Sequence, residues 1–75
     1  MATYNGHRSW NAWNVSLWIN NDEGLYRLAQ NCVRGTKTLG AAARLMLRDL
    51  QGQHTPDGAV YNYTCIREAL RGIES

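Results

Sequence analysis

Residue patterns that build metal or cofactor sites are scarce in this sequence of 75 residues. The two cysteines, Cys32 and Cys65, lie far apart and form no CxxC pair, and His7 and His54 form no HxxxH pair. Zinc sites usually show such local pairs. The sequence therefore predicts no metal and no cofactor, and we interpret both cysteines as small buried hydrophobic residues.

Patterns typical of catalytic sites are also missing. The chain has no nucleophile elbow, no phosphate-binding glycine loop and no Cys–His pair with a local signature. Asp22 and Glu23 are adjacent, so on a helix their side chains diverge by about 100° and do not meet at one substrate atom. We expect a protein that is not an enzyme.

Long apolar runs and a strong excess of one charge are absent too. The N-terminal MATYNGHRSW has no apolar segment after its charges, as a secretory signal would, and no run approaches the roughly 20 residues of a membrane span. We expect a cytoplasmic protein with reduced thiols and no membrane association. A net charge of +2 is too small to diagnose nucleic-acid binding.

The composition is that of one small globular domain. Hydrophobic residues make up 44% of the chain and charged residues 19%, which argues against disorder. We expect a single domain over 1–75, in which the polar segment 1–8 is either an ordered arm or a frayed end. So short a chain has a small core, and all three tryptophans lie between Ser9 and Tyr26.

The spacing of apolar residues predicts a first helix over 9–20, with Ser9 as its N-cap. Trp10, Trp13 and Leu17 share one face, which we expect to form the core. Apolar residues on another side make the segment apolar nearly all round: Val15, Trp18 and Ile19. Such a helix is central to the core or covered on both sides.

A strand is the alternative for the same segment. Four apolar residues alternate with polar ones, as in a half-buried strand: Trp13, Val15, Leu17 and Ile19. Trp18 breaks this alternation, and no equally good strand partner occurs elsewhere. The helix is the favoured interpretation.

Two further helices follow. Asp22 stands at the start of the second, in which the apolar stripe contains Cys32, and Gly35 stands where a C-terminal glycine belongs. Thr38 is a cap for the third, LGAAARLMLRDL. The inward face of this third helix is predicted to contain the following residues: Leu39, Ala42, Ala43, Met46, Leu47 and Leu50.

The obvious loop spans 52–58, in which Thr-Pro-Asp-Gly is typical of a type I turn. Beyond it, Thr64 is the expected cap of a fourth helix that runs to about Arg71. Its predicted core positions are Ile66, Ala69, Leu70 and Ile73. The sequence therefore predicts an all-α fold, a compact bundle of three or four short helices.

A nucleic-acid site is one functional alternative. The second helix, the turn at Gly35 and the third helix resemble a helix-turn-helix in outline. Arg44 and Arg48 would share one face of the third helix, with Lys37 near its start. The same arginines can equally be a solvated helix face or contact a protein, and this helix has no Asn or Gln to read bases.

Trp18 is the aromatic residue that we most readily assign to a partner or dimer contact. It lies on the side of the first helix opposite the face expected in the core, at the end of that helix. Tryptophan is enriched at the energetic centres of protein interfaces. The candidate partner-binding residues are therefore Trp18, Lys37, Arg44 and Arg48.

The segment from Thr3 to Ala29 resembles a group of small proteins carried by bacteriophages and other mobile elements. Their hallmark reads roughly NYETWNVALWI, and its last part is matched here by WNVSLWI, residues 13–19. The earlier part departs, with Trp10, Asn11 and Ala12 where Tyr, Glu and Thr are common, so no role of that Glu carries over. The TPDG turn and IREAL are also similar.

The resemblance implies a small accessory protein in the cytoplasm of an infected bacterium. Such proteins commonly bind a host protein, often a defence component such as a CRISPR–Cas complex. The expected function is therefore stoichiometric protein binding that blocks a bacterial defence system. A small DNA-binding regulator is the alternative, and a self-associating structural protein, such as a homodimer, is a third.

Overall fold

Four helices make up the described part of the chain, and they confirm the all-α prediction. The computed structural model describes residues 9–73, so the segment 1–8, expected to be an arm, lies outside the described residues. The helices are α1 (Trp10–Asn21), α2 (Glu23–Arg34), α3 (Leu39–Leu50) and α4 (Tyr63–Leu70). Residues 9–73 contain no strand, although an isolated antiparallel bridge joins His54 and Val60.

Each helix begins after a residue whose side-chain oxygen accepts a backbone N–H of the first turn. Ser9 caps α1 and Thr38 caps α3, as predicted. The prediction for the fourth helix was wrong by two residues, because Asn62 rather than Thr64 is its cap. The Asn62 Oδ1 accepts the N–H of Cys65 at 2.9 Å. Asparagine is at least as strong an N-cap as threonine, which explains the earlier start.

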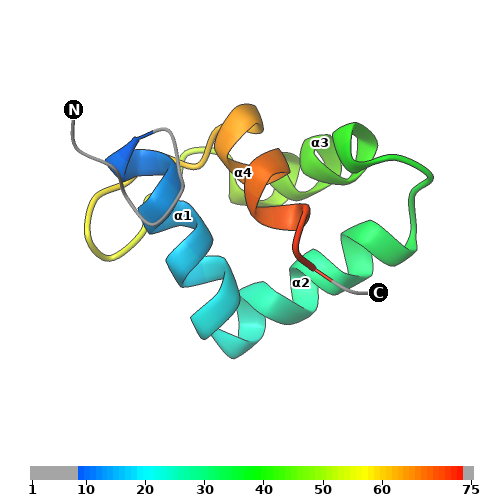
Figure 1. The fold of residues 1–75 in the computed structure, drawn as a ribbon, viewed down its shortest axis with the longest axis horizontal. Helices are drawn as coiled ribbons and strands as arrows, with labels where there is room; N and C mark the ends of the chain where they lie inside the picture. The colour runs from blue at the N-terminus through cyan, green and yellow to red at the C-terminus, as the bar shows by residue number, and fades with distance from the viewer. Residues whose placement is uncertain (1–8, 74–75) are drawn as a thin grey trace.

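A single residue, Asp22, joins α1 to α2. Its backbone N–H donates to the carbonyl of Trp18 at 2.9 Å and so ends α1. Its carboxylate accepts the N–H of Leu25 at 2.9 Å and so begins α2. Because one extended residue does both, the chain turns sharply there, and the two helices form the V seen in Figure 1.

The central helix of the bundle is α4, which packs against α1 and α3, while α2 contacts the same two helices from below (Figure 1). The segment 51–62 runs from the end of α3 back to α1 before it enters α4. The core positions predicted for the fourth helix are all buried, although Ile73 lies beyond the end of α4. Four of the six core positions predicted for the third helix are buried: Ala42, Ala43, Met46 and Leu50. The prediction was wrong for Leu39 and Leu47, which are only partly buried. Among residues 9–73, no helix has the length and apolarity that crossing a membrane requires.

The predicted role of the first tryptophans was wrong, because α1 turns a different face inward. Trp10 and Leu17 are 39% and 37% exposed, and Trp13 is only partly buried. The buried stripe lies two positions further along the helix and consists of Ala12, Val15 and Ile19. Periodicity could not decide between these faces, since both are apolar at the same spacing.

A third stripe fixes the rotation of α1, and it consists of Asn11, Asn14 and Trp18. Each of these residues follows a member of the tryptophan stripe by one position. Because each residue rotates a helix by about 100°, the third stripe lies between the tryptophan stripe and the buried stripe. All three side chains hydrogen-bond to residues of the segment 51–62. The core face lies next to this polar stripe, so turning Trp10 inward would break these hydrogen bonds.

Candidate functional site

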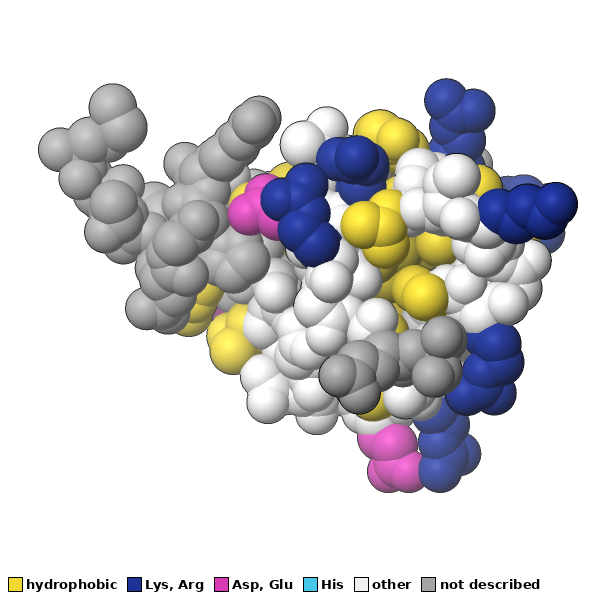
Figure 2. All heavy atoms as spheres, turned by 45° about the vertical axis from the view of Figure 1, so that its right-hand side comes forward, with side chains coloured by type: hydrophobic (Ala, Val, Ile, Leu, Met, Phe, Trp, Pro, Cys, Tyr) yellow, Lys and Arg dark blue, Asp and Glu magenta, His cyan; other side chains and the backbone are white. Residues whose placement is uncertain are grey.

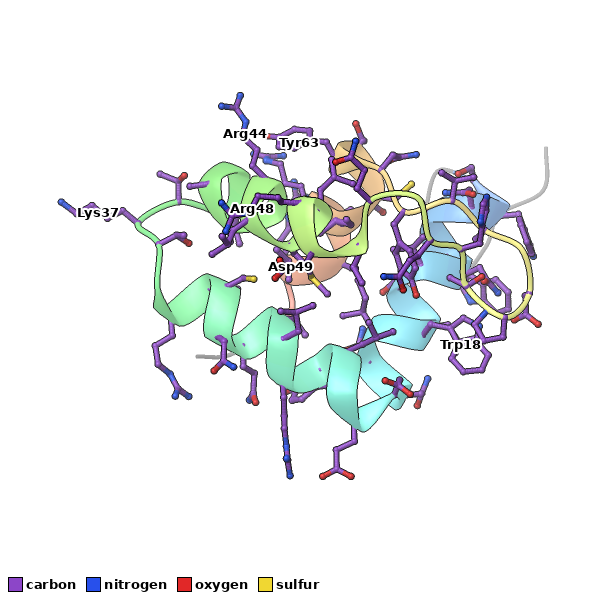
Figure 3. All side chains as sticks on the ribbon, turned by 180° about the vertical axis from the view of Figure 1, so that it is seen from behind. Trp18, Lys37, Arg44, Arg48, Asp49 and Tyr63 are labelled. Atoms are coloured by element: carbon purple, nitrogen blue, oxygen red, sulfur yellow. The ribbon has the colours of Figure 1, made fainter. Side chains whose placement is uncertain are left out.

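The four candidate residues do not form one site. Arg44 and Arg48 are exposed on α3, and Lys37 extends away from them from the turn between α2 and α3 (Figure 3). Trp18 lies at the other end of the molecule. The structure therefore brings the two arginines together, places Lys37 at the edge of their face, and separates Trp18 from all three.

A groove runs along the exposed side of α3, and Arg44, Arg48 and Tyr63 are at its centre. Two adjoining hollows share these three residues, and the larger has a volume of about 640 Å³. The first hollow extends towards Thr36 in the turn between α2 and α3, and the second extends towards Gln51 at the end of α3. We call this feature the α3 groove.

Tyr63 comes from the first turn of α4 and holds one of the arginines. The guanidinium carbon of Arg44 lies 5.8 Å from the centre of the Tyr63 ring, within the range of a cation–π interaction. Figure 3 shows the two side chains next to each other above α3. This contact restricts Arg44 and leaves the edge of its guanidinium available for hydrogen bonds.

Gly40 makes room for the Tyr63 hydroxyl. A Cβ atom at Gly40 would lie 2.9 Å from that oxygen, which is closer than such atoms normally approach, and 4.0 Å from the ring carbon that bears it. The absence of a side chain at Gly40 therefore lets Tyr63 lean on the first turn of α3.

The close approach at Gly40 can be tested with two substitutions. Alanine is favoured over glycine within a helix by up to about 1 kcal/mol. We expect Gly40→Ala to lose this gain because the new methyl group displaces the Tyr63 hydroxyl. In a Tyr63→Phe background the same change should stabilise. Urea unfolding of the four proteins measures the coupling, which we expect to be about 0.5–2 kcal/mol. An equal effect of Gly40→Ala in both backgrounds would contradict the contact.

Trp18 is part of a hydrogen-bond network rather than a free aromatic surface. Its Nε1 donates to Asp57 Oδ2 at 2.9 Å, and the side chain is partly buried. The Nδ2 of Asn14 donates to the same carboxylate oxygen at 2.9 Å. Asn14 is 1% exposed, and its Oδ1 accepts the Thr55 hydroxyl at 2.6 Å. Trp18 thus holds the TPDG turn, which contains Thr55 and Asp57.

Asn11 holds the next part of the same segment. Its Oδ1 accepts the backbone N–H of Val60 at 2.8 Å, and its Nδ2 donates to the Val60 carbonyl at 2.8 Å. Within the turn, the N–H of Gly58 donates to the Thr55 carbonyl at 2.8 Å, and Gly58 has a φ of 95°, which favours glycine. We call Asn11, Asn14 and Trp18, with residues 55–60, the loop clamp.

The carboxylate of the loop clamp, Asp57, has a lowered pKa. Hydrogen bonds from Asn14 and then from Trp18 lower the pKa of Asp57 below its ordinary 3.8, against a smaller opposite effect of burial. Folding therefore favours the ionised carboxylate. The contribution of the ionised Asp57 carboxylate to stability is fully present above the pKa of the unfolded state. This contribution is lost as the pH falls through the lower pKa of the folded state.

This shift gives a prediction for acid unfolding. We expect Asp57→Asn to be less stable than wild type at neutral pH, and the difference to shrink as the pH falls below about 4. Urea unfolding at several pH values, followed by tryptophan fluorescence, measures this difference. A difference that does not depend on pH would show that the ionised form of Asp57 is not favoured by folding.

The Cys32 thiol does not have the surroundings of a reactive thiol. Cys32 and Cys65 are both free and buried. Burial, and then the charge of Asp49, raise the pKa of the Cys32 thiol, while the charge of Arg48 opposes this. A raised pKa leaves little of the nucleophilic thiolate at neutral pH. Within the described residues, no group of three or more metal-ligating side chains is close enough to hold an ion.

Tyr63 and the loop clamp were missed by the sequence analysis. Asn11 and Asn14 carried a usable signal, because two polar residues at i and i+3 among the apolar residues that begin α1 need hydrogen-bond partners once they are buried. Tyr63 carried no local signal, because it is distant from Arg44 in sequence. Only the packing of α4 against α3 brings these two side chains together.

The fold and the groove define a small all-α protein with an exposed surface formed by two arginines of α3 and a tyrosine of α4. A family model described as a family of unknown function (DUF7249) matches residues 1–73, and the chain belongs to this family. No curated protein and no solved structure gives a significant match.

Proposed function

We propose that this protein is a non-enzymatic bacteriophage accessory protein that binds a bacterial host protein stoichiometrically. The proposal places it in the cytoplasm of an infected cell and extends to inhibition of a defence system such as CRISPR–Cas. The resemblance of WNVSLWI to proteins of phages and mobile elements supports this context. The family match does not indicate any activity, because the family is described as one of unknown function.

The α3 groove is the observation that carries the proposal. Arginine and tyrosine are among the residues that contribute most to protein interfaces, and Arg44, Arg48 and Tyr63 meet at its centre. Figure 2 shows the end of the molecule that carries the α2–α3 turn, where hydrophobic side chains are bordered by Lys and Arg side chains. The groove itself has its arginines at the centre and apolar side chains in its walls, and both kinds of residue are frequent in protein interfaces.

The loop clamp changes the choice of residues for testing this function. A Trp18→Ala substitution would remove a hydrogen bond to Asp57 and loosen the segment 51–62, so a loss of binding would have two explanations. Arg44 and Arg48 are exposed side chains on a helix that tolerates alanine. The double substitution Arg44→Ala/Arg48→Ala is therefore the informative one.

Affinity capture from bacterial lysate tests the proposal. We expect the tagged protein to retain a specific host protein in a defined molar ratio at physiological salt, as determined by mass spectrometry and size-exclusion chromatography. Capture of no host protein from lysates of several bacteria would count against protein binding as the function.

A DNA-binding regulator is the second candidate, because Arg44 and Arg48 lie on the exposed face of α3, the second helix of the α2–turn–α3 unit. Duplex binding would then be tight at low salt, and its affinity would fall steeply between about 50 and 200 mM salt. We expect weak binding instead. Tight, salt-sensitive binding that the double arginine substitution abolishes would favour this candidate.

A further inference from the structure

Positive charge in the α3 groove is not neutralised by the described part of the chain. Arg44 and Arg48 line both hollows, whereas no Asp or Glu lines either, and Asp49 lies outside them. Within residues 9–73 neither arginine has an ion-pair partner, and the exposed pair seen there joins Glu23 and Arg27 on α2. A surface complementary to the groove therefore carries negative charge.

The two arginines are arranged to bind carboxylates. They are four positions apart on α3, which places their Cβ atoms about 5–6 Å from each other on one helix face. The Tyr63 ring lies against Arg44 and limits its motion, so less conformational entropy is lost when a carboxylate binds the free edge of the guanidinium. Two acidic side chains at neighbouring positions on a partner segment match this spacing.

The walls of the groove are largely apolar. Ala41 and Leu45 line the first hollow, and Leu47 and Tyr61 line the second. A partner that offered only charged groups would leave these walls exposed to water. A segment with an apolar side chain between or beside its acidic residues would bury them and gain free energy from doing so.

The number of cations argues against a nucleic-acid backbone as the occupant. Proteins that bind duplex DNA tightly often neutralise 6–10 phosphates. The face of the groove offers Arg44 and Arg48, with Lys37 at its edge. About three phosphate contacts would give a weak and strongly salt-sensitive interaction, and would make no use of the apolar walls.

We infer that the α3 groove docks an acidic, partly apolar peptide segment of the partner protein. Carboxylates bind the guanidinium groups of Arg44 and Arg48, and an apolar side chain packs against Leu45 or Leu47. This inference rests on the proposed function, to which it adds the surface and the chemistry of the partner.

A display library of random dodecapeptides tests this inference directly. We expect the peptides selected by the wild-type protein to be enriched in Asp or Glu next to an apolar residue. The selected peptides, made synthetically, should bind Arg44→Ala/Arg48→Ala at least about tenfold more weakly in fluorescence anisotropy. Arg44→Lys/Arg48→Lys should bind with intermediate affinity, because lysine keeps the charge but not the two-pronged hydrogen bonding.

A matched control uses Arg27→Ala/Arg34→Ala, which removes the same charge from α2, outside the groove. Its affinity for the selected peptides should stay within about twofold of wild type. Equal weakening by both double substitutions would show that net charge, not the groove, drives binding. Selected peptides without acidic enrichment, or tighter binding of a single- or double-stranded oligonucleotide than of any peptide, would overturn the inference.

The same variants separate this inference from the proposed function. A host protein captured equally by wild type and by Arg44→Ala/Arg48→Ala would leave the function standing and refute the groove as its surface. Acidic peptides that bind the groove, without any host protein captured from lysate, would support the groove and refute the function. Loss of the captured host protein with Arg44→Ala/Arg48→Ala, but not with the α2 control, would support both.

Discussion

Replacing Ile19 with alanine is expected to lower the free energy of unfolding by about 2–5 kcal/mol, whereas Trp10→Ala should lower it by no more than about 1–2 kcal/mol. Ile19 is fully buried, so its truncation leaves a cavity between packed helices. Trp10 is 39% exposed, so its truncation leaves a space that water can enter. The larger aromatic residue thus contributes less than the smaller aliphatic one.

Thermal and urea unfolding of the two variants measure this difference. The total stability of a domain of this size is near the lower end of about 5–15 kcal/mol, so Ile19→Ala should come close to unfolding the protein. Ile19→Val is the graded control and should cost only about 0.5–1.5 kcal/mol. A Trp10→Ala variant that is less stable than Ile19→Ala would mean that α1 turns its Trp10 face, and not its Ile19 face, towards the core.

Asn14→Leu is the second substitution with a large expected effect, about 2–4 kcal/mol of lost stability. Leucine has a similar size but cannot accept the Thr55 hydroxyl or donate to Asp57. Thr55 is 3% exposed, so in this variant its hydroxyl would have neither Asn14 nor water as a hydrogen-bond acceptor. Burying an unsatisfied polar group typically costs about 1–3 kcal/mol, and the Thr55 hydroxyl would become such a group. The polar network that Asn14 connects is lost at the same time.

A double-mutant cycle with Thr55→Val tests whether the loop clamp is the cause. We expect a coupling free energy between Asn14 and Thr55 of about 1–3 kcal/mol, because the second substitution removes the group that the first left unpaired. Asn20→Ala is the matched control on the same helix. Asn20 is exposed and bonds only within α1, to Ser16, so its removal should cost about 0.5 kcal/mol or less. Additive effects of Asn14→Leu and Thr55→Val would refute the clamp.

The loop clamp joins the two sequence segments on which the expected resemblance to phage proteins rests. Asn14 and Trp18 belong to WNVSLWI, and both bond to Asp57 of the TPDG turn. The WNVSLWI segment and the TPDG turn are distant in sequence but therefore form one interacting unit. The arginines that we propose for binding lie outside both segments.

The sequence by itself determined the elements whose signals are local. Ser9 and Thr38 were identified as caps because a cap depends on bonds to the next three residues. The core positions of α4 and four of those of α3 followed from their spacing, because these apolar residues recur on one helix face. Arg44 and Arg48 were placed together for the same reason, because residues four apart share a helix face.

Only the tertiary structure decided the rotation of α1 and the contents of the groove. The tryptophan stripe and the stripe of Ala12, Val15 and Ile19 have the same spacing, so hydrophobic periodicity favours neither. The choice depends on Asn14 reaching Thr55 and Asp57 across more than half of the chain. In the same way, Tyr63 reaches Arg44 only because α4 packs on α3 where Gly40 leaves room. Such contacts join residues that are distant in sequence, and no local pattern encodes them.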